Sequence, residues 1–125
     1  MEFIHTENAP QAIGPYSQAV VHGDLVFASG QVALDPKTMT IVGDTVTEQT
    51  NRVLTNLAAV LRQAGSGMDH VIKTTVYLAD MSSFAEMNAE YERHFGRHKP
   101  ARAAIAVREL PKQSLVEIDA VAVRE

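Results

Sequence analysis

Two neighbouring stretches near the C-terminus decide the fold: Pro100–Val107, with the sequence PARAAIAV, and Leu115–Val123, with the sequence LVEIDAVAV. Both have the apolar character of buried strands. Leu110–Ser114 between them indicates a turn, because proline cannot donate to a strand ladder. One charge, Arg102, interrupts the first strand, and Glu117 lies near the centre of the second. A charged side chain inside a core strand is costly unless it has a partner, so these two residues are the first candidates for function.

Two helices and a further strand are predicted in the middle of the chain. Thr45–Glu48 fits a capping box and is followed by an apolar stripe at helical spacing, which predicts a helix over residues 46–64. Val71–Ala79 alternates and is rich in β-branched residues, so it is expected to be a strand. Ser83–Glu86 fits a second capping box and opens a helix that should end before Gly96.

The N-terminal third is predicted to contribute strands. Phe3–His5 could form a short edge strand, and Ser17–Val21 with Leu25–Ser29 has the pattern of a hairpin. Gly30 follows the second hairpin strand, where it indicates a bulge or a close approach by another backbone or a ligand.

The order of these elements predicts the α+β class, with one mixed or antiparallel sheet and two helices on one of its faces. The last strand, Leu115–Val123, is apolar on both sides, and two helices cannot cover both faces. We therefore expect the open face to pack against other copies of the chain.

Composition limits the classes of protein to consider. A chain of 125 residues with 46% hydrophobic and 21% charged residues is expected to form one domain, residues 1–125. The absence of cysteine excludes disulfides and thiolate chemistry, and the formal charge of −4 argues against nucleic-acid binding. No secretory signal and no apolar run of about 20 residues is visible, so no membrane association and a cytoplasmic location are expected.

Arg102 is the first candidate for ligand binding. Ala104 and Ala106 project to its side of the strand, and such small neighbours leave space beside the guanidinium. Arginine holds a carboxylate through two parallel hydrogen bonds, which favours an anchor for an acidic ligand. A structural ion pair with an acidic residue is the alternative, and the pattern leaves both open.

Glu117 and Asp119 are two residues apart on a strand, so their side chains share one face at about 6–7 Å. One of them could act as a general base on water, or the two could be ion-pair partners for Arg102, Lys73 or an arginine of a neighbouring subunit. The pattern does not decide which carboxylate faces a cavity.

Three further positions have polar side chains at unusual places. Tyr16 follows Gly-Pro in a loop, Ser29 precedes Gly30 at a strand end, and Asn88 lies on the inward stripe of the second helix. Each could contact a ligand, and each could instead pack or tie down a loop. His94 and His98 have helical spacing but lack a third ligand, so no metal site is expected.

Several segments, in order and over nearly the whole chain, together closely resemble the RidA/YjgF family. They are Ala12–Val20 (AIGPYSQAV), Ser29–Gln31 (SGQ), Val71–Leu78 (VIKTTVYL), Met87–Tyr91 (MNAEY), Pro100–Arg102 (PAR) and Val116–Ile118 (VEI). The resemblance implies a chorismate-mutase-like fold and a homotrimer with active sites between subunits. It also implies hydrolysis of reactive 2-enamine and 2-imino acids, such as 2-aminoacrylate, to 2-keto acids and ammonia, without metal or cofactor.

The resemblance also implies roles for individual residues. Arg102 would hold the substrate carboxylate, and Glu117 would hold or activate the attacking water. The cleft would be lined by Tyr16, Ser29, Gly30 and Asn88, and the backbone at Ala104 would bond the imine nitrogen or carbonyl oxygen. Two other functions remain open: a non-catalytic sensor of 2-keto acids or other small carboxylates, and an endoribonuclease or translation inhibitor.

Overall fold

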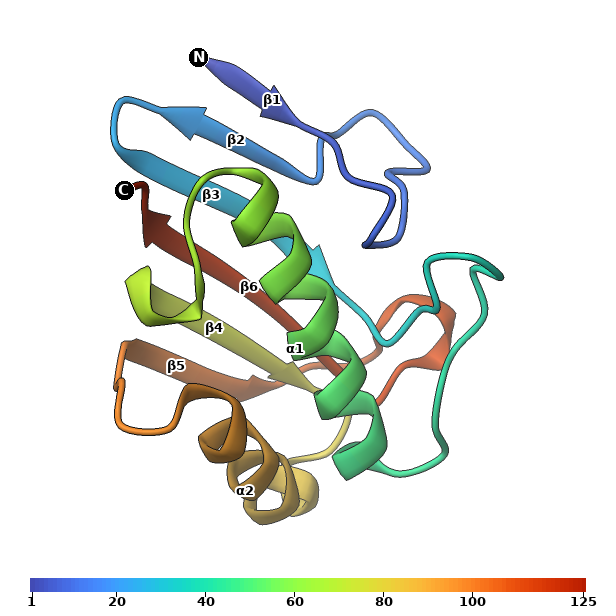
Figure 1. The fold of residues 1–125 in the computed structure, drawn as a ribbon. Coiled ribbons are helices and arrows are strands. Elements are labelled where there is room, and N and C mark those ends of the chain that lie inside the picture. Colours follow the sequence, from blue (N-terminus) through green and yellow to red (C-terminus); the bar gives the residue numbers. More distant parts are fainter.

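The computed structural model describes all of residues 1–125 as one six-stranded sheet with two helices against one face (Figure 1). The strands and helices are β1 (Glu2–Ile4), β2 (Ala19–His22), β3 (Leu25–Gln31), α1 (Val46–Gln63), β4 (Val71–Leu78), α2 (Phe84–Phe95), β5 (Ala101–Ala106) and β6 (Val116–Val123). The sheet order is β1-β2-β3-β6-β4-β5, and only β4 and β5 are parallel. The predicted α+β class, with a mixed sheet and both helices on one face, is confirmed. None of the helices has the length and apolar character that crossing a membrane requires.

The start of α1 agrees with the capping box in the sequence. The Thr45 hydroxyl accepts a hydrogen bond from the Glu48 backbone N–H at 3.1 Å, and the Glu48 carboxylate accepts one from the Thr45 N–H at 3.2 Å. Gly65 follows the helix with φ of 82°, the left-handed conformation that often ends a helix.

The predicted capping box at the start of α2 is wrong. Ser83 already has a helical conformation (φ −84°, ψ 0°), and its hydroxyl makes no capping bond. A 3₁₀ turn, Met81–Ser83, precedes α2, and the Asp80 carboxylate accepts a hydrogen bond from the Ser82 N–H at 2.9 Å. The cap therefore lies one turn earlier than the sequence pattern indicates, because the chain enters α2 through this extra turn.

β6 lies in the middle of the sheet and separates its two faces. The side chains that alternate toward the helices are buried: Val116, Ile118, Ala120 and Ala122. Those on the opposite side, which we call the open face, are half-buried: Glu117, Asp119, Val121 and Val123. Large apolar side chains continue the open face on neighbouring strands, with Phe27 on β3 45% exposed and Ile105 on β5 also exposed. The open side of β6 is thus apolar at Val121 and Val123, whereas Glu117 and Asp119 make the other half of this side acidic, so the expectation of a strand that is apolar on both sides holds only for its C-terminal half.

β5 is an edge strand, which corrects the expectation that Arg102 belongs to a core strand. β5 pairs only with β4, and most of its residues are exposed. Four of its six residues are alanine, and this composition does not distinguish a buried strand from an exposed one.

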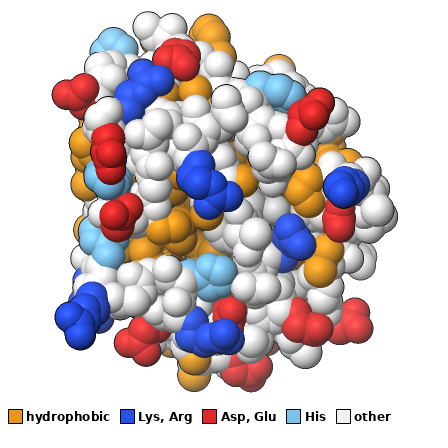
Figure 2. Space-filling model, viewed as in Figure 1, with side chains coloured by type: hydrophobic (Ala, Val, Ile, Leu, Met, Phe, Trp, Pro, Cys, Tyr) orange, Lys and Arg blue, Asp and Glu red, His pale blue; other side chains and the backbone are white.

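On the helix side of the molecule, acidic and basic side chains are intermingled (Figure 2).

Candidate functional site

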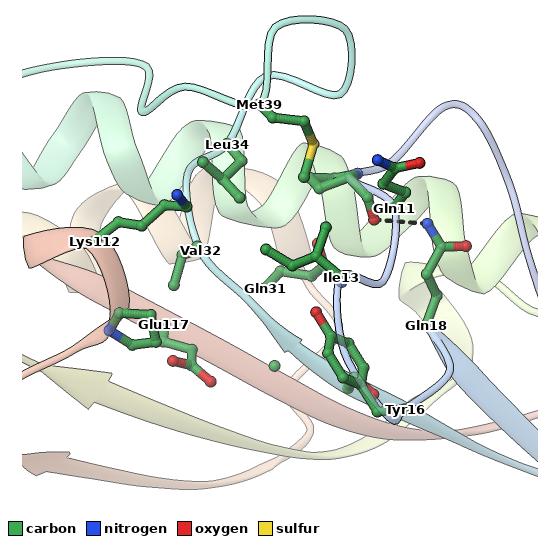
Figure 3. A pocket seen from close by; sticks show the side chains of 14 residues that line it. Gln11, Ile13, Tyr16, Gln18, Gln31, Val32, Leu34, Met39, Lys112 and Glu117 are labelled. Atoms are coloured by element: carbon green, nitrogen blue, oxygen red, sulfur yellow. Dashed lines mark hydrogen bonds between the residues drawn. The ribbon is translucent and has the colours of Figure 1, made fainter.

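A cavity of about 410 Å³ lies where β3 ends and β6 begins, and it collects four of the predicted site residues (Figure 3). These are Tyr16, Ser29, Gly30 and Glu117. The rest of its wall is mixed: Ile13, Val32, Leu34 and Met39 are apolar, and Gln11, Gln18, Gln31 and Lys112 are polar. The residues predicted from the sequence therefore include part of the polar lining of this cavity, which we call the Glu117 cavity, but not its three glutamines or Lys112.

The Glu117 carboxylate lies in the cavity and accepts no hydrogen bond from a side chain of the protein. Burial raises the pKa of the Glu117 carboxyl above its ordinary value of 4.5, and the charge of Asp119 raises it further. A carboxylate that is half-buried and lacks donors is poised to bind water or a substrate proton.

Gly30 provides the space that Glu117 needs. The pairing of β3 with β6 shifts register between Ala28 and Gln31, which is the bulge predicted at this position. A methyl group on Gly30 would lie 3.0 Å from Cδ and 3.2 Å from Cγ of Glu117, and closer still to its Oε2. The sequence predicts a bulge or a close approach by another backbone or a ligand; the structure has the bulge, and the group that approaches Gly30 is the Glu117 side chain.

Ser29 and Tyr16 are placed differently at the cavity. The Ser29 hydroxyl donates to the Ser17 carbonyl oxygen at 2.6 Å, and the Ser29 N–H donates to the Gln18 carbonyl oxygen at 2.9 Å. The hydroxyl has therefore used its one proton and can offer a ligand only its lone pairs. Tyr16 is 53% exposed, and its ring points into the open part of the cavity (Figure 3).

Arg102 lies in a second hollow, of about 400 Å³, between α2 and β5. Its Nη1 donates to Asn88 Oδ1 at 2.7 Å, and its guanidinium lies 4.8 Å from the ring centre of Tyr91 and 5.4 Å from that of Phe84. The guanidinium makes no ion pair within the chain and keeps further N–H groups free. The alternative of an intrachain structural ion pair is therefore wrong, because the acidic candidates lie elsewhere.

Arg102 and Glu117 lie on opposite faces of the sheet. Arg102 is in register with Thr74, whose hydroxyl contacts the Tyr91 phenol of α2 at 2.7 Å. Glu117 is in register with Tyr77 on the open face. Paired residues on neighbouring strands share a face, so a single chain does not bring the two charged groups together.

The predicted site residues consequently form two groups. Tyr16, Ser29, Gly30 and Glu117 form the first, and Asn88 with Arg102 forms the second. Ala104 follows Arg102 along β5, and its side chain packs against the core on the helix side. The Val107 N–H donates to the Leu78 carbonyl at 2.8 Å, so by alternation the N–H and C=O of Ala104 point away from β4 at the free sheet edge.

Some residues around these groups were not expected from the sequence. Lys112 lines the Glu117 cavity, and both it and Gln113 have left-handed backbone conformations, with φ of 55° and 56°. The turn after Pro111 was predicted, but a turn motif does not say where its side chains point. The contact of the Phe84 and Tyr91 rings with the Arg102 guanidinium was not expected either.

No group of three or more acidic or histidine side chains is arranged to hold a metal ion. Instead, the His94 Nε2 lies 2.9 Å from Asn51 Oδ1, and the His98 Nε2 lies 2.6 Å from the Val71 carbonyl oxygen. Both imidazoles therefore connect α2 and its C-terminal loop to neighbouring elements.

Comparison with known proteins gives consistent matches over the whole chain. A family model described as endoribonuclease L-PSP matches residues 6–124. A RutC family protein from Pyrococcus horikoshii is 52% identical over 99% of this chain and 98% of its own length. The 2-iminobutanoate/2-iminopropanoate deaminase of Salmonella typhimurium is 45% identical over 97% of this chain and 96% of its own length. The crystal structure of E. coli TdcF with bound serine superposes with a TM-score of 0.95 and 40% identity, covering 100% of both chains.

Proposed function

Since this chain belongs to the RidA/YjgF family, whose family model is described as endoribonuclease L-PSP, we propose that it hydrolyses 2-enamine and 2-imino acids to 2-keto acids and ammonia. The relative from Salmonella typhimurium, named for this activity, supports the proposal. The observation that carries it is the pair of incomplete half-sites. The first half-site has the Arg102 guanidinium, whose free N–H groups can bind a carboxylate. The second has the Glu117 carboxyl group, which accepts no hydrogen bond from the protein and can bind water.

The two half-sites of one chain cannot form a complete site, so the proposal requires an assembly of several copies. Arg102 and Glu117 are on opposite faces of one sheet, so a complete site requires Arg102 of one copy beside Glu117 of the next. The apolar open face and the free edge of β5 are surfaces on which such copies could pack. A homotrimer, closed by rotation so that each copy gives Arg102 to one site and Glu117 to another, meets these conditions.

In the proposed reaction, Arg102 fixes the substrate carboxylate, with Asn88 holding the guanidinium and Tyr91 and Phe84 supporting it from one side. Glu117 orients a water molecule and takes one of its protons while the oxygen bonds to C2 of the imine. The nitrogen gains this proton from Glu117 and then the hydroxyl proton of the tetrahedral intermediate, the C2–N bond breaks, and ammonia leaves as the C2 carbonyl forms. Imine hydrolysis has a modest barrier, so positioning of the two reactants supplies much of the required acceleration.

The other residues of the two groups have supporting roles. Tyr16, Ser29 and Gly30 line the cavity around the water and the substrate carbon. In the proposed reaction, the outward N–H and C=O of Ala104 bond the imine nitrogen of the substrate or the carbonyl oxygen of the product. These roles match the donors and acceptors that each residue has left unused.

A coupled assay tests the proposal. A serine or threonine dehydratase releases the imine, semicarbazide traps it, and an active deaminase lowers the yield of semicarbazone. Wild-type protein and the control Arg97→Ala, which removes an exposed cation outside both half-sites, should lower the yield. Arg102→Ala should not lower it, and Arg102→Lys should do so only weakly because lysine cannot form a bidentate pair.

Two results would instead favour the other functions. Binding of serine or a 2-keto acid without any change in semicarbazone yield would indicate a small-carboxylate sensor, a possibility to which the serine-bound TdcF structure lends support. RNA cleavage that falls with salt and survives Arg102→Ala would indicate a ribonuclease.

A further inference from the structure

The open face has a small polar group beside Glu117. The Tyr77 phenol donates to Asp119 Oδ2 at 2.9 Å. Tyr77 is the direct cross-strand partner of Glu117, and Asp119 lies two residues beyond Glu117 on the same face of β6. The spacing of a strand places the two carboxylates about 6–7 Å apart.

Among the strands and loops around Glu117, Asp119 is the only acidic residue whose side chain faces it. β4 contributes Tyr77 and also Lys73, which pairs with Val121 and so lies diagonally across from Asp119. The loops contribute Tyr16 and Lys112, and β3 contributes the uncharged Ser29–Gly30 segment. β5 presents alanine and isoleucine on this face. Asp119 makes no ion pair within the chain, and the phenol that it accepts from is neutral at physiological pH. No cation is in direct contact with the Asp119 carboxylate, and a hydrogen bond from Tyr77 fixes its position.

We propose that Asp119, fixed by Tyr77, is a positioning residue that strengthens Glu117 as the base of the reaction. A second negative charge at this distance makes ionisation of Glu117 harder, so the carboxylate binds a proton from water more readily. Asp119 itself touches no substrate in this account and acts only through Glu117. The inference rests on the proposed function for the reaction, but the electrostatic coupling exists whether or not the protein is a deaminase.

The direct test is an NMR titration of the Glu117 side chain in protein labelled with ¹³C at glutamate carboxyls, with Glu117→Gln assigning the signal. Asp119→Asn removes the charge and leaves an oxygen that can still accept from Tyr77. The control is Asp24→Asn, the same chemical change in the exposed turn between β2 and β3, at the opposite end of the sheet from Glu117. Asp119→Asn should lower the Glu117 midpoint by about 0.5–1.5 pH units, and Asp24→Asn should leave it in place.

Two further readouts separate this role from a structural one. In the coupled assay, the rising limb of the pH profile of kcat/KM should move to lower pH in Asp119→Asn by the same amount. The Tyr77 pKa, which Asp119 raises, should fall in this variant and can be followed with ¹³C-labelled tyrosine. Equal midpoints of Glu117 in the two variants, or an unchanged Tyr77 titration, would overturn the inference. If the wild type shows the coupled titrations but no turnover, the coupling is correct and the proposed function fails.

Discussion

Substitution of Gly30 by alanine should inactivate the protein without unfolding it. The new methyl group would lie 3.0 Å from Glu117 Cδ, where ordinary contacts begin near 3.4 Å, so the carboxyl group must retreat. Its nearer oxygen must move further, by about 1 Å. A displacement of this size can cost about 100-fold in rate, which corresponds to about 2.7 kcal/mol of transition-state stabilisation. We therefore expect kcat/KM in the semicarbazide assay to fall about 100-fold.

Stability should change little, because the atoms that must move belong to the end of a flexible side chain and Gly30 does not have a left-handed backbone. Gly23→Ala is the matched control, since Gly23 has φ of 61° and open space around it. That variant should lose about 1 kcal/mol of stability through backbone strain and keep its activity. The double variant Gly30→Ala/Glu117→Gln should be no worse than Glu117→Gln alone. Full activity in Gly30→Ala, or additive losses in the double variant, would refute the placement of Glu117 in the reaction.

Three other predictions follow from the same contacts. Asn88→Ala removes the side-chain oxygen that accepts from Arg102 at 2.7 Å, while the contacts of Arg102 with both aromatic rings remain. Substrate binding should weaken, so KM should rise about 10-fold with kcat nearly unchanged. A fall in kcat alone would contradict this role of Asn88. The pKa of Glu117 is raised in the folded protein, so its contribution to stability is full below pH 4.5 and is lost as the pH rises through the folded pKa. Glu117→Gln should therefore stabilise the protein at pH 8 more than at pH 4, as measured by urea unfolding, and a larger gain at pH 4 would reverse the assigned shift. Thr45→Ala removes the cap of α1 and should cost about 1 kcal/mol in urea unfolding with activity unchanged, whereas no loss would mean that the capping box is not formed in solution.

The fold could be predicted to a large extent, because its signals are local and periodic. The Thr45–Glu48 cap, the stripe of α1 and the alternation of β4 and β6 each depend on residues within one element. The cap of α2 could not be predicted correctly, since Asp80 acts through an added 3₁₀ turn that the Ser83–Glu86 pattern does not reveal. The edge position of β5 also depends on strand order, which a six-residue strand with four alanines does not encode.

The residues of the candidate site could be predicted from the sequence, but their arrangement in space could not. The sequence indicated that Arg102 and Glu117 were unusual, and it left open an ion pair between them. Their separation follows from which neighbour each strand pairs with, Thr74 in one case and Tyr77 in the other. Only the strand register shows that the two groups face opposite sides of the sheet.

The measurement that tests the central claim most directly is complementation between two inactive variants. Arg102→Ala and Glu117→Gln are each purified, mixed in equal amounts, unfolded and refolded together, and assayed by loss of semicarbazone. If each site takes Arg102 from one copy and Glu117 from the next, about one quarter of all sites in the refolded mixture have both residues, and about one quarter of wild-type activity returns. If the mixture stays as inactive as its components while refolded wild type regains full activity, the two residues do not meet across a subunit interface, and the account is wrong.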